Sequence, residues 1–251
     1  MESVKKYYFI SDFHLGAPDY LTSLEREKKV VKWLDQVKQD AKEIYILGDI
    51  FDFWFEYKTV VPKGYVRLLG KIAEICDSGI PVHFFSGNHD MWCFDYFPKE
   101  LGVILYKNPV KKNIEGKSFY IGHGDGLGPG DIGYKFIKKL FQSRVCQWMF
   151  GWIHPNFGIG LANFFSSRSR AVNLKKDELF LGEENEWLIQ FCQDTLNKGE
   201  NIEFFIFGHR HLPLDIKLTG NSRYINLGEW MNYCTYAVYD GNNLELKKFS
   251  E

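Results

Sequence analysis

The chain has 251 residues, 45% of them hydrophobic and 25% charged, and this ordinary globular composition excludes disordered, collagen-like and low-complexity proteins. Lys and Arg number 31 against 32 Asp and Glu, a formal net charge of -1, which argues against a nucleic-acid-binding protein. The length predicts a single domain over residues 1–251. The five dispersed cysteines form no C-x-x-C pair, so reduced thiols and a cytoplasmic location are expected. With no apolar run approaching ~20 residues, any membrane contact is expected to be peripheral.

Short apolar runs, each closed by glycine or a polar residue, alternate with helical stretches in the first half of the chain. The pattern predicts buried strands over residues 7–10, 43–47, 82–85 and 118–121. It predicts helices over residues 25–38 and 66–76, where apolar residues recur at helical spacing. Strand followed by helix, repeated, predicts an α/β fold of βαβ units around a central sheet.

The next segment breaks this rhythm, because no strand pattern occurs between residues 124 and 176. Four alternate glycines, from Gly124 to Gly130, predict a loop, and residues 131–142 predict an amphipathic helix. Residues 145–165 are rich in Trp, Phe, Ile, Leu and Met. Residues 131–176 contain eight basic residues and one acidic residue, a net charge of +7. We therefore expect residues 126–176 to form an inserted helical lid, called the lid segment below.

After the lid segment the strand pattern returns. Residues 203–207 predict another buried strand, and residues 224–227 a further one. Two short runs, 236–239 and 244–246, flank the turn sequence Asp240-Gly241-Asn242-Asn243. This arrangement predicts a β-hairpin near the end of the chain.

A polar motif follows each of five predicted strands. The motifs are Asp12-Phe13-His14, Gly48-Asp49-Ile50-Phe51-Asp52, Gly87-Asn88-His89-Asp90, Gly122-His123-Gly124-Asp125 and Gly208-His209-Arg210-His211. Since the carboxyl ends of the strands of an α/β sheet form one rim, five strands are expected to bring these side chains together. Mixed Asp, His and Asn ligands suit Mn²⁺, Fe or Zn²⁺. The set exceeds the needs of one ion, and two ions bridged by a carboxylate are typical of phosphoester hydrolysis.

The ordered motifs D-x-H, GD-x-x-D, GNH-[DE], H and GH-x-H resemble those of the calcineurin-like metallophosphoesterases, and they span residues 12 to 211. The resemblance implies a four-layer αββα β-sandwich with an inserted helical lid. It implies that Asp12, His14 and His211 bind a first metal ion, and that Asn88, His123 and His209 bind a second. Asp49 is implied to bridge the two ions. His89 is implied to act as a general acid or transition-state donor, oriented by Asp52.

The lid segment carries the expectation about substrate. Its apolar residues followed by cations suit an amphiphile with acyl chains and a phosphate, and also an anionic membrane surface. We expect Trp152, Phe165, Arg168, Arg170 and Lys175 to bind substrate, together with Asn88 and His89. An ordinary helical subdomain with its own small core is the alternative.

The whole arrangement also resembles the UDP-2,3-diacylglucosamine hydrolases of lipid A biosynthesis. The resemblance rests on Ser11-Asp12-Phe13-His14-Leu15-Gly16, on Gly48-Asp49-Ile50-Phe51-Asp52-Phe53-Trp54 and on a helical lid after His123-Gly124-Asp125. It implies two Mn²⁺ ions and attack by a bridging hydroxide on the α-phosphorus of UDP-2,3-diacylglucosamine, giving UMP and 2,3-diacylglucosamine 1-phosphate. One position departs from the pattern: the best-known branch has Arg after the motif Asn, where this chain has His89.

The resemblance also implies partners and a location. The substrate is expected to be an amphiphilic nucleotide-sugar lipid, and the protein is expected in the cytoplasm, bound peripherally to the inner-membrane surface. No nucleic acid and no obligate protein partner are expected. Two alternatives remain open. One is a metallophosphoesterase that acts on another phosphomonoester or phosphodiester, such as a nucleotide or phosphoprotein. The other is a metal-bound scaffold without turnover, against which Asp12, Asn88, His89 and His211 argue.

Overall fold

A computed structural model describes residues 5–250 except 131, 178 and 181, and it leaves undescribed the side chains of residues 167 and 169–177. The helices are α1 (Tyr20–Val37), α2 (Val66–Asp77), α3 (Tyr96–Leu101), α4 (Ile132–Phe141), α5 (Arg144–Gly151), α6 (Pro155–Asp177) and α7 (Trp187–Asn197). The strands are β1 (Lys6–Ile10), β2 (Ala41–Ile46), β3 (Val82–Phe85), β4 (Ile104–Tyr106), β5 (Val110–Ile114), β6 (Lys117–Ile121), β7 (Phe204–Phe207), β8 (Pro213–Lys217), β9 (Arg223–Leu227), β10 (Thr235–Tyr239) and β11 (Leu244–Lys248).

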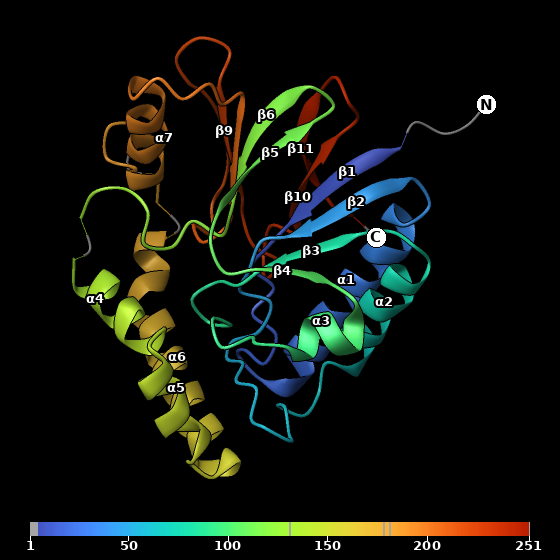
Figure 1. The fold of residues 1–251 in the computed structure, drawn as a ribbon, viewed down its shortest axis with the longest axis vertical. Helices are drawn as coiled ribbons and strands as arrows, with labels where there is room; N and C mark the ends of the chain where they lie inside the picture. The colour runs from blue at the N-terminus through green and yellow to red at the C-terminus, as the bar shows by residue number, and fades with distance from the viewer. Residues whose placement is uncertain (1–4, 131, 178, 181, 251) are drawn as a thin grey trace.

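The strands form two sheets (Figure 1). A six-stranded sheet has the order β11-β10-β1-β2-β3-β4, with β1 to β4 parallel. A five-stranded sheet has the order β5-β6-β7-β9-β8, with β6, β7 and β9 parallel. The strand–helix alternation predicted a central sheet. It did not show that the strands divide between two sheets, because buried strands of either sheet carry the same apolar pattern.

Successive residues of the central strands face two different cores. In β1, Tyr7 and Phe9 pack between the two sheets, while Tyr8 and Ile10 pack against the layer of α1 and α2. This two-residue period is the one that a pleated strand imposes. On the outer face of the second sheet, α7 contributes Leu188, Ile189 and Cys192 to a third core. The order helices, sheet, sheet, helix confirms the expected four-layer αββα sandwich.

Most predicted elements occur close to their expected positions. β3 coincides with the predicted strand 82–85, α4 with the predicted helix 131–142 to within a residue at each end, and β10 and β11 form the predicted hairpin. Three strands were not predicted: β4, β5 and β8. All three lie at sheet edges, where many of their side chains are partly or fully exposed. Edge strands lack the continuous apolar run that marks a buried strand.

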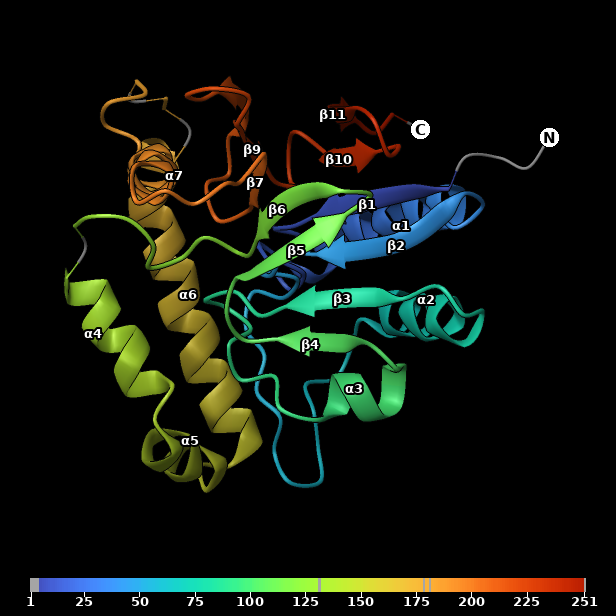
Figure 2. The same cartoon turned by 45° about the horizontal axis from the view of Figure 1, so that its top comes forward.

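Helices α4, α5 and α6 lie between β6 and α7 in the chain, and Figures 1 and 2 show them beyond the carboxyl ends of β1, β2 and β3. Ser143 begins α5 by accepting a hydrogen bond from the Cys146 backbone N–H. No helix within the described part of the chain combines the length and apolarity needed to cross a membrane. The boundaries 126–176 of the lid segment, and its function as a lid, stay predictions.

Candidate metal centre

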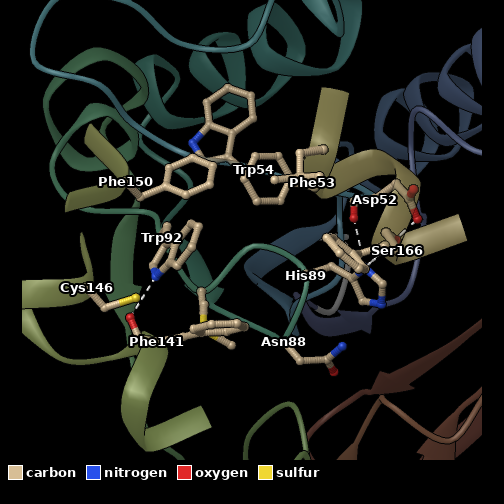
Figure 3. A pocket seen from close by; sticks show the side chains of 14 residues that line it. Asp52, Phe53, Trp54, Asn88, His89, Trp92, Phe141, Cys146, Phe150 and Ser166 are labelled. Atoms are coloured by element: carbon tan, nitrogen blue, oxygen red, sulfur yellow. Dashed lines mark hydrogen bonds and ion pairs between the residues drawn. The ribbon is translucent and has the colours of Figure 1, made fainter. Parts of the chain in front are cut away.

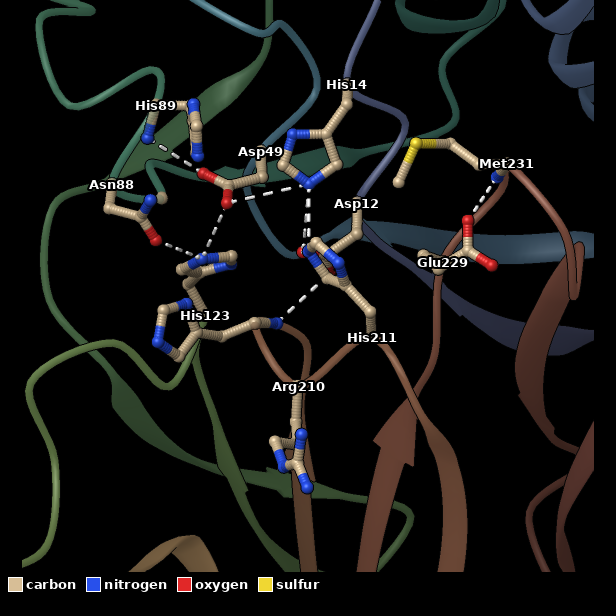
Figure 4. Close-up of polar contacts among 12 residues, drawn as sticks. Asp12, His14, Asp49, Asn88, His89, His123, Arg210, His211, Glu229 and Met231 are labelled. Atoms are coloured by element: carbon tan, nitrogen blue, oxygen red, sulfur yellow. Dashed lines mark hydrogen bonds and ion pairs between the residues drawn. The ribbon is translucent and has the colours of Figure 1, made fainter. Parts of the chain in front are cut away.

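The predicted metal ligands come from the ends of five strands in two different sheets. Asp12 and His14 follow β1, Asp49 follows β2, and Asn88 follows β3 in the first sheet. His123 follows β6, and His209 and His211 follow β7, in the second sheet. Figure 4 shows the side chains of Asp12, His14, Asp49, Asn88, His123 and His211 converging on one region. The carboxyl edges of both sheets therefore build the site, rather than the rim of a single sheet.

The backbone at these positions is strained. Asp12, His14, Asp49 and His209 all have positive φ, at 56°, 45°, 53° and 64°. Such conformations cost free energy in residues other than glycine, and they persist where the surrounding structure imposes them, often at functional sites. Glycines allow the close approach of the carboxylates, because a Cβ at Gly208 would overlap Asp12 Oδ2 and a Cβ at Gly87 would overlap Asp49 Oδ1.

The first predicted ligand group is Asp12, His14 and His211. Asp12 Oδ2 accepts a hydrogen bond from the His209 backbone N–H at 3.0 Å, which orients the carboxylate. Its Oδ1 is buried without a hydrogen-bond partner in the described structure. It lies 3.7 Å from His14 Nε2 and 3.5 Å from His211 Nε2, and these two nitrogens are 3.0 Å apart. An unpaired carboxylate oxygen facing two imidazole nitrogens is costly when buried, and a divalent cation between them would satisfy all three.

The second predicted group is joined to the first through Asp49. Asp49 Oδ2 lies 3.3 Å from His123 Nε2 and 3.9 Å from His14 Nε2, so one oxygen faces a ligand of each group. Asn88 Oδ1 is 3.2 Å from His123 Nε2, and His209 lies close to both Asp49 and His123. His123 Nδ1 is 2.7 Å from the Leu47 carbonyl oxygen. Because a carbonyl only accepts, Nδ1 carries the hydrogen and Nε2 is left to bind a cation. This geometry suits the predicted bridging role of Asp49.

The pKa values of three histidines of the site, His14, His209 and His123, shift in different directions. Burial lowers the pKa of His14 to about 4, against the opposing effect of Asp12. Burial likewise lowers the pKa of His209 to about 4, and the nearby His123 adds to that effect. At neutral pH both rings are therefore neutral, as ligands must be. Burial also disfavours a charged His123, but Asp49 outweighs it and raises the pKa of His123 to about 10. A metal ion at Asp49 and His123 would therefore displace a proton.

His89 lies beside the ligand groups. Its backbone N–H donates to Asp49 Oδ1 at 2.9 Å, and its ring packs edge-on against His14 with centroids 4.9 Å apart. Its Nδ1 is 2.8 Å from the backbone carbonyl oxygen of Asp52 and 3.9 Å from that residue's carboxylate. Asp52 therefore contacts His89 mainly through its backbone carbonyl, whereas the prediction did not say which part of Asp52 orients the ring. One ligand atom from each of His89, His14 and Asp49 lies within 4.8 Å of the others, close enough for the three to hold a metal ion.

Similarity to known proteins identifies the family of this chain. The family model described as calcineurin-like phosphoesterase matches residues 5–213. The chain belongs to the calcineurin-like phosphoesterase family. A protein named UDP-2,3-diacylglucosamine hydrolase from Porphyromonas gingivalis is 38% identical over 257 residues, which cover 98% of each chain. A protein of the same name from Aeromonas salmonicida is 27% identical, over 92% of this chain and 88% of that protein. A dimetal phosphatase structure from Danio rerio aligns over 98% and 96% of the two chains with 13% identity and a TM-score of 0.48.

The phosphoesterase is accordingly a metal-dependent hydrolase. Its candidate metal centre also contains Asp90, a residue to which the sequence analysis assigned no role. Asp90 is fully buried, and its two oxygens accept hydrogen bonds from the Ile50 backbone N–H at 2.8 Å and the Gly87 backbone N–H at 2.6 Å. It thus ties the loop after β2 to the loop after β3. Burial, reinforced by the Asp49 charge, raises the pKa of Asp90 to about 7. Its place as the last residue of the Gly87-Asn88-His89-Asp90 motif was the available signal.

A pocket opens directly beside the candidate metal centre of this phosphoesterase. Its cavity measures about 420 Å³. Asn88, His89 and Ser166 lie at one end, and most of the remaining wall is apolar and aromatic (Figure 3). The apolar lining consists of Phe53, Trp54, Met91, Trp92, Phe141, Cys146, Phe150, Leu161, Ala162 and Phe165. Trp92 Nε1 donates to the Phe141 carbonyl at 2.8 Å, which ties the loop after the metal motif to α4.

The predicted substrate-binding residues of the lid segment separate in space. Phe165 lines this pocket. Trp152 does not; it lines a different groove with Phe55, Tyr57 and Trp148. Arg168 is exposed, and the side chains of Arg170 and Lys175 lie outside the described residues. The core residues Phe53, Met91 and Trp92 were not predicted to line the pocket, although they directly follow two of the metal motifs in the sequence.

Proposed function

We propose that this chain hydrolyses the pyrophosphate bond of UDP-2,3-diacylglucosamine, giving UMP and 2,3-diacylglucosamine 1-phosphate in lipid A biosynthesis. The observation that carries the proposal is the apolar pocket that begins at Asn88 and His89. A substrate for this site joins a phosphate group to a long apolar group, which a free nucleotide or a phosphoprotein does not. The relative from Porphyromonas gingivalis, similar over 98% of both chains, carries the name of this activity.

The dimensions of the pocket suit part of an acyl chain. The cavity of about 420 Å³ is far larger than the roughly 10–15 Å³ that a cavity needs to hold one water molecule, so it has room for a run of methylene groups. Burial of an acyl chain among aromatic side chains contributes binding free energy in proportion to the apolar area removed from water.

The proposed roles of the polar residues follow from their positions. Asp12, His14 and His211 would bind one divalent ion, Asn88, His123 and His209 the other, and Asp49 both; we propose Mn²⁺ from the Asp, His and Asn donor set. When bound, the two ions supply Lewis acidity and a water of lowered pKa. His89 Nδ1–H donates to the Asp52 carbonyl, which orients the ring and would leave Nε2 to face the reacting group. A protonated His89 would stabilise charge on the phosphate oxygens or protonate the leaving oxygen. Arg168, with Arg170 and Lys175, would attract the charged head group.

We also propose that the lid segment contacts the cytoplasmic surface of the inner membrane. Exposed side chains on α4 and α5 include Ile132, Phe136, Val145, Trp148 and Met149. Lys135 and Lys139 lie on α4. Exposed Trp and Phe beside basic residues suit the interface of an anionic bilayer, where an acylated substrate would be found.

The test is a comparison of two nucleotide sugars with Mn²⁺ present. We expect release of UMP from UDP-2,3-diacylglucosamine and at least 100-fold lower kcat/KM for UDP-N-acetylglucosamine, which has the same pyrophosphate without the acyl chains. Chelation of the metal with EDTA should abolish both reactions. Equal kcat/KM values for the two would overturn the lipid assignment and favour a phosphoesterase for another phosphomonoester or phosphodiester. Cosedimentation with vesicles of phosphatidylglycerol tests the membrane contact separately.

A further inference from the structure

Ser166 of helix α6 touches the candidate general acid. Its Oγ lies 3.2 Å from Nδ1 of His89, although the two residues are 77 positions apart in the chain. The same Nδ1 lies 2.8 Å from the backbone carbonyl oxygen of Asp52. Figure 3 shows Ser166 and Asp52 close together beside the His89 ring. A side chain of the lid segment and a backbone group of the core therefore meet at one ring nitrogen.

The chemistry of the two partners determines the hydrogen positions. The Asp52 carbonyl only accepts, so Nδ1 of His89 carries a hydrogen. This N–H is then shared between two acceptors, the Asp52 carbonyl oxygen at 2.8 Å and Ser166 Oγ at 3.2 Å. The longer hydrogen bond, to Ser166, is the weaker of the two. Two acceptors restrict rotation of the imidazole better than one. The His89 side chain is 16% exposed, so part of its surface lacks packing that would otherwise restrict it.

Ser166 also adjoins the apolar pocket. It lines the pocket together with Leu161, Ala162 and Phe165 of the same helix. The helical turn that would contact an acyl chain is thus the turn that contacts His89. This pairing was not predictable from the sequence, because Ser166 belongs to a run of small and polar residues distant from every motif.

We propose that Ser166 is a positioning residue, which holds the His89 ring in the orientation that presents Nε2 to the reacting phosphate. The inference rests on the proposed role of His89 and not on the identity of the lipid. Ser166 acts on the rate of the chemical step and not on substrate affinity, because it orients a group that is needed only in the transition state.

The test uses the Mn²⁺-loaded protein and bis(4-nitrophenyl) phosphate, a small substrate that leaves the pocket empty. We expect Ser166→Ala to lower kcat by about 3- to 10-fold, the range of one neutral hydrogen bond, with KM changed less than about twofold. Ser166→Thr, which keeps the hydroxyl, should retain most of kcat. Ser143→Ala is the matched control, since it removes a lid hydroxyl whose hydrogen bond within the described part of the chain is to the Cys146 backbone N–H. It should leave kcat near that of the unaltered protein.

A double-mutant cycle decides whether the effect passes through His89. In the His89→Ala background, Ser166→Ala should lower kcat no further, because there is no ring left to orient. A second loss of the same size in that background would overturn the proposal, and so would an unaltered kcat in Ser166→Ala or an equal loss in Ser143→Ala. If His89→Ala itself keeps full kcat, the proposed role of His89 fails as well, so the two failures are distinguishable.

A readout without turnover completes the test. In the metal-free protein labelled with ¹⁵N-histidine, the His89 Nδ1 resonance is identified by its absence in His89→Ala. We expect Ser166→Ala to shift this resonance and Ser143→Ala to leave it in place. An unshifted resonance in Ser166→Ala would show that the hydroxyl does not bind the ring and would overturn the proposal.

Discussion

Replacing Phe165 with serine tests whether the apolar pocket binds the substrate's acyl chain. Phe165 lines the pocket and its side chain is 60% exposed in the structure, so a bound chain has apolar surface to cover. A Phe side chain offers roughly 200 Å², so covering the exposed part removes about 120 Å² from water, worth at most about 3 kcal/mol. Side-chain ordering reduces this gain, and we expect kcat/KM for the diacylated substrate to fall by about tenfold.

The neighbouring Phe164 supplies a matched control. It is 59% exposed, almost as much as Phe165, but it does not line the pocket. Phe164→Ser should therefore change kcat/KM for the diacylated substrate by less than about twofold, and neither variant should affect bis(4-nitrophenyl) phosphate. The assay is the steady-state rate for both substrates with both variants. Equal losses for Phe164→Ser and Phe165→Ser, or equal effects on the two substrates, would refute the assignment of the pocket.

Three further predictions concern the core. Asp49→Ala should remove metal as well as turnover, because its Oδ2 faces His14 and His123 alike; two full equivalents of metal in the variant would contradict the bridging role. His89→Ala should keep its metal and lose kcat by roughly 10²–10⁴-fold, and His89→Arg should partly restore it; equal inactivity of the two variants would count against kinship with the branch that has Arg here. Arg210→Met removes the cation that pairs with both oxygens of buried Glu186, at 3.0 and 2.8 Å, so the free energy of unfolding should fall by about 3–5 kcal/mol. Adding Glu186→Leu should recover most of this loss. Urea denaturation measures the free energy of unfolding, and a loss below about 1 kcal/mol in Arg210→Met would disprove the reasoning.

The convergence of the predicted metal ligands was predictable from the sequence, because each of these residues follows a strand that can be recognised locally. Asp12, Asp49, Asn88 and His123 all come within a few residues of an apolar run closed by glycine or a polar residue. Such motifs are local in the chain, and their order carries the family resemblance. Helix α4 was predictable for the same reason, since helical spacing is also a local property.

Two features of the site depended on tertiary structure. The sequence did not show that the ligands come from two sheets, because the apolar pattern of a buried strand is the same in either sheet. Nor did it separate Phe165, which lines the pocket, from Trp152, which lies in another groove, because both are large apolar residues of one helical segment. Which face of a lid helix meets the core depends on how that helix packs. The contact between Ser166 and His89 has the same origin: it joins residues 77 positions apart, and only the folding of α6 over the strand ends brings them together.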